Sequence, residues 1–109
     1  MSRRVLLGVV LFAAACYPKA GAPPTLTPAA VASATARWPG TSEASLSAGH
    51  DLFLAKCNAC HDYPDLVAIS EDRWPHTLEK MGNKAHLSPN EREEVLRYVL
   101  AARSEAVAH

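Results

Sequence analysis

Several features of common protein classes are scarce or missing in this chain. Aromatic residues make up only 6% of its 109 residues, and the 11 basic side chains are matched by 11 acidic ones. That balance gives no basic excess for binding nucleic acid. The longest apolar run, residues 5–15, is about half of the roughly 20 residues that span a bilayer. No segment shows the alternation of a half-buried strand. What remains is one small domain with three cysteines.

The N-terminus has the composition of an export signal. Arg3 and Arg4 precede the apolar run, and small alanines end it. A basic start, a short apolar core and small residues are typical of a secretory signal that is later removed. We therefore expect residues 1–15 to be a signal peptide. Loss of its two arginines leaves a mildly acidic mature chain.

Cys16 follows this signal directly. Residues 12–16, Phe-Ala-Ala-Ala-Cys, resemble the end of a bacterial lipoprotein signal, in which the cysteine is lipidated and becomes the new N-terminus. The resemblance implies a lipid anchor on the periplasmic side of a bacterial membrane, held by more than one acyl chain. Tyr17 after the cysteine resembles the pattern of lipoproteins that are sorted to the outer membrane. The alternative is an ordinary signal cleaved after Ala15 or Ala22, with an incidental cysteine.

The next segment, residues 16–41, is rich in proline, alanine and threonine. Such a composition buries little apolar surface and tends to extend. We expect a tether here, with a helical turn or two over residues 29–38 and Trp38 docking on the folded part. The folded domain then occupies residues 42–109. A core of that size is marginal without a covalent or cofactor staple.

The domain is expected to be all-α, with about three helices. Ser42 or Ser45 can cap a first helix that leads into the cysteine pair. Ser70 can cap a second, which Gly82 would stop.

The last helix has the clearest start. Ser88-Pro89-Asn90-Glu91 is a capping box with proline at the first helical position. Glu93 and Arg97 are spaced for an i,i+4 ion pair. Four apolar residues recur at helical spacing, namely Val95, Leu96, Val99 and Leu100.

Residues 57–61, Cys-Asn-Ala-Cys-His, form the attachment pattern of a c-type haem. The thiols of Cys57 and Cys60 are spaced to reach the two vinyl groups of one haem. The following histidine, His61, can then place its imidazole on the iron. The sequence thus predicts one covalent haem c, with His61 as the proximal ligand.

Other roles for a Cys-x-x-Cys pair are a redox disulfide, half a zinc site, or a structural disulfide. A zinc site needs four ligands, and the chain has no second cysteine pair. A thioredoxin-like site needs a βαβ context, which the pattern lacks. The disulfide remains open because export leads to an oxidising compartment.

The residues around the motif resemble class I cytochromes c over about residues 46–100. That family has a glycine and then an aromatic four residues later on the helix entering the haem motif, as Gly49 and Phe53 stand here. It also has an aromatic on a C-terminal helix that crosses near the glycine, matched by Tyr98. The resemblance implies a small cytochrome c-like fold around the haem. Pro64 and Pro75 do not match the family's proline downstream of the ligand histidine.

The sixth iron ligand is expected to be Met81, the one methionine besides the initiator. It lies where the family's distal ligand lies, and it shares a helix face with Trp74 and Leu78. Core packing is its other role.

His86, before the last helix, is the alternative ligand. His76, Asn83, Lys80 and Lys84 are more remote options, His50 is expected on the surface, and His109 lies in the C-terminal tail. Arg73 and Trp74 are candidates for contacts with the haem propionates, against roles as a surface charge and a core aromatic.

These features predict a monohaem cytochrome that passes single electrons between redox partner proteins outside the cytoplasm. It would act alone or as an electron-transfer subunit of an oxidoreductase complex, with no small-molecule substrate or nucleic acid as partner. The alternative is a haem module for ligand binding or sensing, with the sixth iron site open or weakly held. Catalysis such as a peroxidase activity lacks a separate acid–base pair. A haem-free lipoprotein with a Cys57–Cys60 disulfide is the last alternative.

Overall fold

The computed structural model describes residues 22–57 and 63–108, and in these ranges it contains helices and no strand. Its elements, in chain order, are α1 (Pro28–Arg37), α2 (Glu43–Lys56), the 3₁₀ helix η1 (Glu71–Arg73), α3 (Trp74–Lys84) and α4 (Pro89–Ala108). The all-α prediction is confirmed. The described part of the predicted domain contains three α-helices, as expected, and α1 precedes them within the predicted linker.

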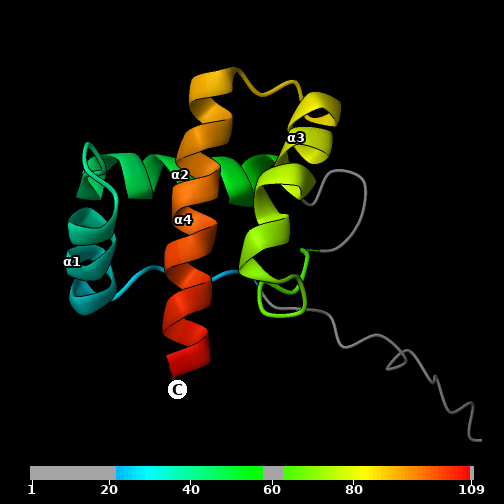
Figure 1. The fold of residues 1–109 in the computed structure, drawn as a ribbon. Coiled ribbons are helices and arrows are strands. Elements are labelled where there is room, and N and C mark those ends of the chain that lie inside the picture. The colour runs from blue at the N-terminus through cyan, green and yellow to red at the C-terminus, as the bar shows by residue number, and fades with distance from the viewer. Residues whose placement is uncertain (1–21, 58–62, 109) are drawn as a thin grey trace, which may run out of the picture.

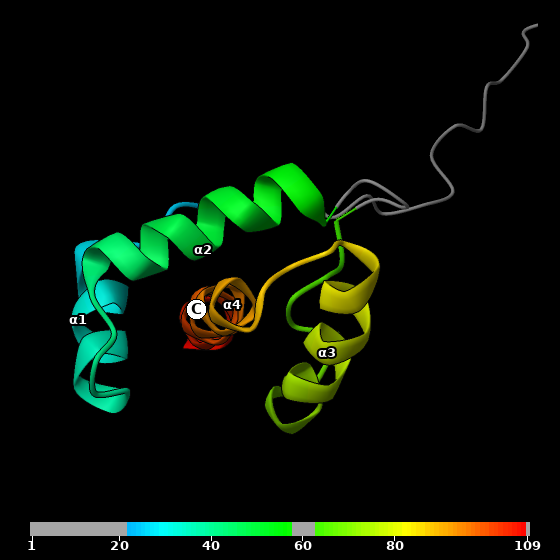
Figure 2. The ribbon, with the colours of Figure 1, turned by 90° about the horizontal axis from the view of Figure 1, so that it is seen from above.

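Helix α4 is the centre of the arrangement. It stands between α1 on one side and α3 on the other, while α2 runs across it (Figures 1 and 2). The last turn of α2, which leads into the cysteine motif, lies close to the end of α3 (Figure 2).

Local sequence signals set where α2 and α4 begin. Ser42 and Ser45 form a reciprocal capping box, in which each side-chain oxygen accepts from the other's backbone N–H, at 3.1 and 2.9 Å. The Ser88–Glu91 box is also present, with Glu91 Oε1 accepting from Ser88 N–H at 2.9 Å and Ser88 Oγ from Glu91 N–H at 3.1 Å. These two predicted caps are confirmed. The third predicted cap, Ser70, is wrong, because Ser70 makes no side-chain capping bond and α3 begins after Arg73.

Helix α3 ends two residues later than predicted. Gly82 is helical, and the left-handed residue is His86, at φ 59°. Leu87 N–H donates to Gly82 O at 2.9 Å, and His86 N–H donates to Asn83 O at 3.3 Å. These two bonds form a Schellman motif, which satisfies carbonyls that the helix end leaves open. The prediction that Gly82 ends α3 is therefore wrong, because the left-handed residue that follows the helix is His86.

The core lies where α2, α3 and α4 meet. Its largest fully buried side chains are Phe53 from α2, Trp74 and Leu78 from α3, and Tyr98 from α4. The predicted apolar face of α4 is confirmed, since Val95, Val99 and Leu100 are buried and Leu96 packs against the same cluster. The predicted Glu93–Arg97 ion pair is present at 2.7 Å on the exposed side.

The folded part begins earlier than predicted. The helical turn or two expected over residues 29–38 is a full helix, α1 (Pro28–Arg37). Its Ala34 is buried against Leu46 and Ala101, so this part of the predicted tether packs on the domain. The composition of this segment predicted little packing, but its small alanine side chains allow α1 to pack closely against the neighbouring helices. Trp38 packs against the core as expected, with the guanidinium carbons of Arg37 and Arg97 at 4.5 and 5.3 Å from its ring centre.

The segment before α1 is also held. Tyr98 Oη donates to Pro24 O at 2.6 Å, and His50 Nε2–H donates to Pro23 O at 2.9 Å. His50 is half-buried, with its ring 4.8 Å from that of Tyr98, so its expected surface position is wrong. The two proline carbonyls supply acceptors for side chains that the α2–α4 crossing would otherwise leave unsatisfied.

Among the described helices, none is both long and apolar enough to cross a membrane. The predicted signal peptide (1–15) and Cys16 lie outside the described residues.

Candidate functional site

Cys57 is the C-cap of α2 and is 8% exposed. Its backbone N–H donates to Phe53 O at 3.0 Å, which continues the helical hydrogen bonding by one residue. Its side chain belongs to the main core cluster with Phe53, Trp74 and Val95. Cys60 and His61, the other predicted haem-binding residues, lie outside the described residues.

Burial governs the chemistry of the Cys57 thiol. Desolvation raises its pKa to about 11, so the free thiol is uncharged at neutral pH. Reactive redox thiols have the opposite shift, because the thiolate is the nucleophile. This environment disfavours the thioredoxin-like alternative, whereas it suits a sulfur that is to be held in an apolar site.

The crossing of α2 and α4 fixes the helix that carries Cys57. At Gly49, an added Cβ would lie 2.2 Å from Glu94 O and 3.0 Å from Tyr98 Cβ, so only glycine allows the two backbones to approach this closely. One turn further, the rings of Phe53 and Tyr98 contact at 6.1 Å between centres. The predicted close crossing of Gly49 and Tyr98 is confirmed.

Beyond the motif, the chain returns to α2 at Tyr63. Its hydroxyl donates to Leu54 O at 2.9 Å, and its ring stacks on that of Phe53 at 5.9 Å between centres. The sequence alone predicts no role for Tyr63. The one feature that could have indicated a role is its position two residues after His61.

Helix α3 forms the other wall of the core. Trp74 and Leu78 are buried on its inner face, and Met81, one turn further, is half-buried. The indole N–H of Trp74 donates to Leu66 O at 3.1 Å, so its one donor is already used and a propionate contact would have to break this bond. Arg73 is exposed at the helix start.

The histidine candidates lie at different depths. His86 is exposed and holds its left-handed conformation after α3. His76 is exposed on α3 itself. His50 is engaged with Pro23 on the far part of α2. His109 lies outside the described residues.

The surroundings of Cys57 are apolar. Its side chain is a buried member of the core cluster, and the half-buried apolar side chains that pack against this cluster include Tyr63, Leu66, Ile69 and Leu87. A porphyrin needs such an apolar surface for its faces. Within residues 22–57 and 63–108, no group of three or more His, Cys, Asp or Glu side chains is arranged to hold a metal ion. A zinc cluster is therefore not formed by these residues.

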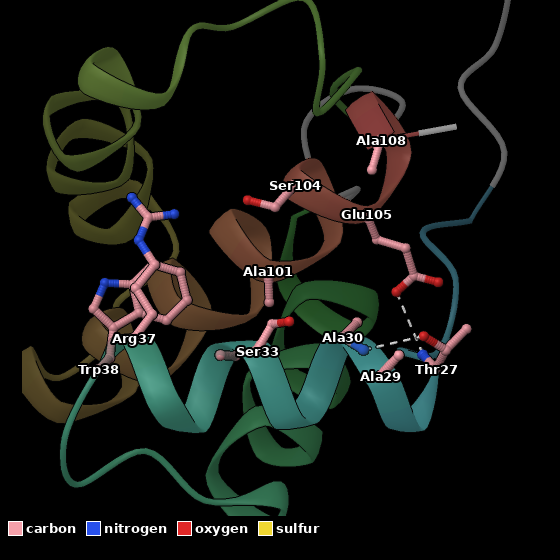
Figure 3. A pocket seen from close by; sticks show the side chains of 11 residues that line it. Thr27, Ala29, Ala30, Ser33, Arg37, Trp38, Ala101, Ser104, Glu105 and Ala108 are labelled. Atoms are coloured by element: carbon pink, nitrogen blue, oxygen red, sulfur yellow. Dashed lines mark hydrogen bonds between the residues drawn. The ribbon is translucent and has the colours of Figure 1, made fainter.

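A separate cavity of about 240 Å³ lies between α1 and the C-terminal half of α4 (Figure 3). Ala29, Ala30 and Ala101 line it, and Thr27 closes one end, where its N–H donates to Glu105 Oε2 at 3.4 Å. No cysteine, histidine or methionine contributes to its lining. It is distinct from the surroundings of Cys57.

Comparisons with models of protein families, with characterised proteins and with solved structures give no match for this chain. The sequence motif and the residues around Cys57 are therefore the features that indicate a function.

Proposed function

We propose that this protein is a monohaem c-type cytochrome that transfers single electrons between redox partner proteins outside the cytoplasm. The observation that carries the proposal is the Cys57-Asn58-Ala59-Cys60-His61 motif. Two features support it: the burial of Cys57 in the apolar core, and the tight crossing at Gly49 that anchors its helix. Cys57 and Cys60 would hold the haem as thioethers, and His61 would bind the iron.

The bound haem would supply the chemistry, because its iron alternates between the ferric and ferrous states. The chain's own contribution is to exclude water and to hold the ligands still. The apolar side chains of Phe53, Trp74 and Leu78 serve the first purpose. The α2–α4 crossing serves the second, since it fixes the helix that precedes the motif.

We propose Met81 as the distal ligand. Its half-buried position on α3, after the buried Trp74 and Leu78, supports this choice over the exposed His86. A thioether ligand raises the reduction potential relative to a second histidine. With both axial positions filled, the protein would be a carrier and not an enzyme or a ligand sensor.

Optical spectra of the oxidised and reduced protein, produced together with the haem-attachment machinery, test this proposal. We expect a low-spin haem with a long-wavelength sulfur-to-iron band that is lost in Met81→Ala and kept in His86→Ala. Loss of the low-spin spectrum in His86→Ala alone would make His86 the ligand. A high-spin wild type that binds carbon monoxide would favour ligand sensing, and a haem-free protein with a Cys57–Cys60 disulfide would overturn the proposal.

We propose that residues 1–15 direct export and that Cys16 carries a lipid anchor on the periplasmic side of the membrane. Radiolabelled palmitate tests this directly. The wild type is expected to incorporate label and to sediment with membranes, whereas Cys16→Ser should do neither. Equal behaviour of the two proteins would favour the ordinary signal with an incidental cysteine.

A further inference from the structure

Leu54 lies in the last turn of α2, which ends at Lys56. The last backbone carbonyls of a helix generally need partners from outside it. The hydroxyl of Tyr63 donates to Leu54 O at 2.9 Å. A side chain from beyond the cysteine motif therefore supplies one hydrogen bond to the last turn of the helix before it.

A second contact fastens the same side chain. The Tyr63 ring lies nearly parallel to that of Phe53, at 17° between planes and 5.9 Å between centres. Phe53 is itself fully buried and in contact with Tyr98. Ring and hydroxyl together attach Tyr63 to two adjacent residues of one helical turn.

The opposite end of the motif is attached to the same turn. Cys57 N–H donates to Phe53 O at 3.0 Å, so both Cys57 and Tyr63 are tied to residues 53–54. Cys60 and His61 lie between these two points along the chain. Cys57 and Tyr63, the described residues on either side of residues 58–62, are thus held at one place on α2.

We propose that Tyr63 is a positioning residue for haem ligation: by fastening the chain to Leu54 and Phe53, it fixes the direction from which His61 meets the iron. The proposal builds on the proposed cytochrome function and assigns a role to a residue outside the attachment motif. Tyr63 acts through His61 and does not itself bind the iron.

Tyr63→Phe tests the hydroxyl, because it keeps the ring on Phe53 and removes only the bond to Leu54. Tyr98→Phe is the matched control: it also removes a tyrosine hydroxyl bound to a backbone carbonyl, that of Pro24, and its ring also contacts Phe53. Both variants are expected to lower stability. The informative readouts are the electron paramagnetic resonance g-values of the ferric protein and the reduction potential.

We expect Tyr63→Phe to shift the g-values and the potential, and Tyr98→Phe to leave both as in the wild type. Tyr63→Leu, which removes hydroxyl and ring, should shift both further in the same direction, and far-ultraviolet circular dichroism verifies that the variants are folded. Unchanged g-values and potential in a haem-loaded Tyr63→Phe overturn the positioning role alone. Equal shifts in both tyrosine variants also overturn it, since they indicate a general loss of rigidity. A wild type without haem overturns the proposed function and this role with it.

Discussion

Gly49 and Glu94 bring the backbones of α2 and α4 into direct contact. A methyl group on Gly49 would lie 2.2 Å from the Glu94 carbonyl oxygen, which is backbone and cannot swing aside. The separation of the two helices is therefore set at this point, and with it the position of the helix that ends at Cys57.

Gly49→Ala should push the helices apart. Overpacking against fixed backbone costs typically about 1–3 kcal/mol, and we expect a loss of about 3 kcal/mol in the free energy of unfolding, measured with denaturant. Gly82→Ala is the control, because its Cβ would meet the side-chain Cδ of Arg92 at 3.2 Å, and that side chain can move. We expect Gly82→Ala to be neutral or to gain up to about 1 kcal/mol from helix propensity. Similar losses in both variants would contradict a backbone clash specific to Gly49.

His86→Gly should stabilise the protein. His86 occupies the left-handed region at φ 59°, which costs residues with a Cβ about 1 kcal/mol relative to glycine. We expect a gain of about 0.5–1 kcal/mol in the free energy of unfolding, with the haem spectrum unchanged. His86→Ala is the comparison, because it keeps the strain and should not stabilise. A change of spectrum in both variants would instead show that His86 binds the iron.

Tyr98→Phe should lower stability by about 1 kcal/mol at neutral pH, because it removes the hydrogen bond to Pro24. Burial raises the pKa of Tyr98 above its ordinary value of 10.0, so the folded protein keeps this proton at a pH where the unfolded chain has lost it. The resulting stability is present below pH 10 and declines as the pH rises through that value. Unfolding followed by circular dichroism from pH 8 to 11 should show the advantage of the wild type over Tyr98→Phe shrinking. A constant difference would contradict a tyrosine kept neutral by burial.

Ala34→Glu should detach α1. Ala34 is 2% exposed between α1 and the helices carrying Leu46 and Ala101, and burying a carboxylate in this apolar interface is costly. Once α1 is released, trypsin should cut after Arg37 much faster than in the wild type. Ala36→Glu, on the exposed side of α1, should leave the cleavage rate unchanged. Fast cleavage of the wild type itself would mean that α1 is not docked in solution.

The parts of the fold that the sequence predicts correctly depend on neighbouring residues. The Ser42 and Ser88 caps, the Glu93–Arg97 pair and the apolar face of α4 are all defined within one or two helical turns. The Gly49–Tyr98 crossing is the exception, since it joins distant segments, and it came from a family resemblance.

The features that sequence analysis missed join residues far apart in the chain or require an uncommon conformation. Tyr98 is hydrogen-bonded to Pro24, 74 positions away in the sequence, and His50 to Pro23, 27 positions away. No local sequence pattern predicts either bond. The end of α3 was misplaced because glycine is the usual residue at the left-handed position, whereas this chain uses His86. The Cys-x-x-Cys-His motif predicts the candidate site from the sequence. The hydrogen bond from Tyr63 to Leu54 O could not be predicted, because it depends on how the chain folds back on α2.

The bonds that hold Pro23 and Pro24 also set how far the domain can travel. For a chain anchored through Cys16, as proposed, a tether running to residue 41 would be roughly 85 Å long when extended, at about 3.4 Å per residue. The domain could then move far from the membrane surface. With Pro23 held on the domain, the covalent path from the lipid is at most about 24 Å. The domain would then stay within about its own width of the bilayer. Its electron partners would have to be embedded in that membrane or come to its surface.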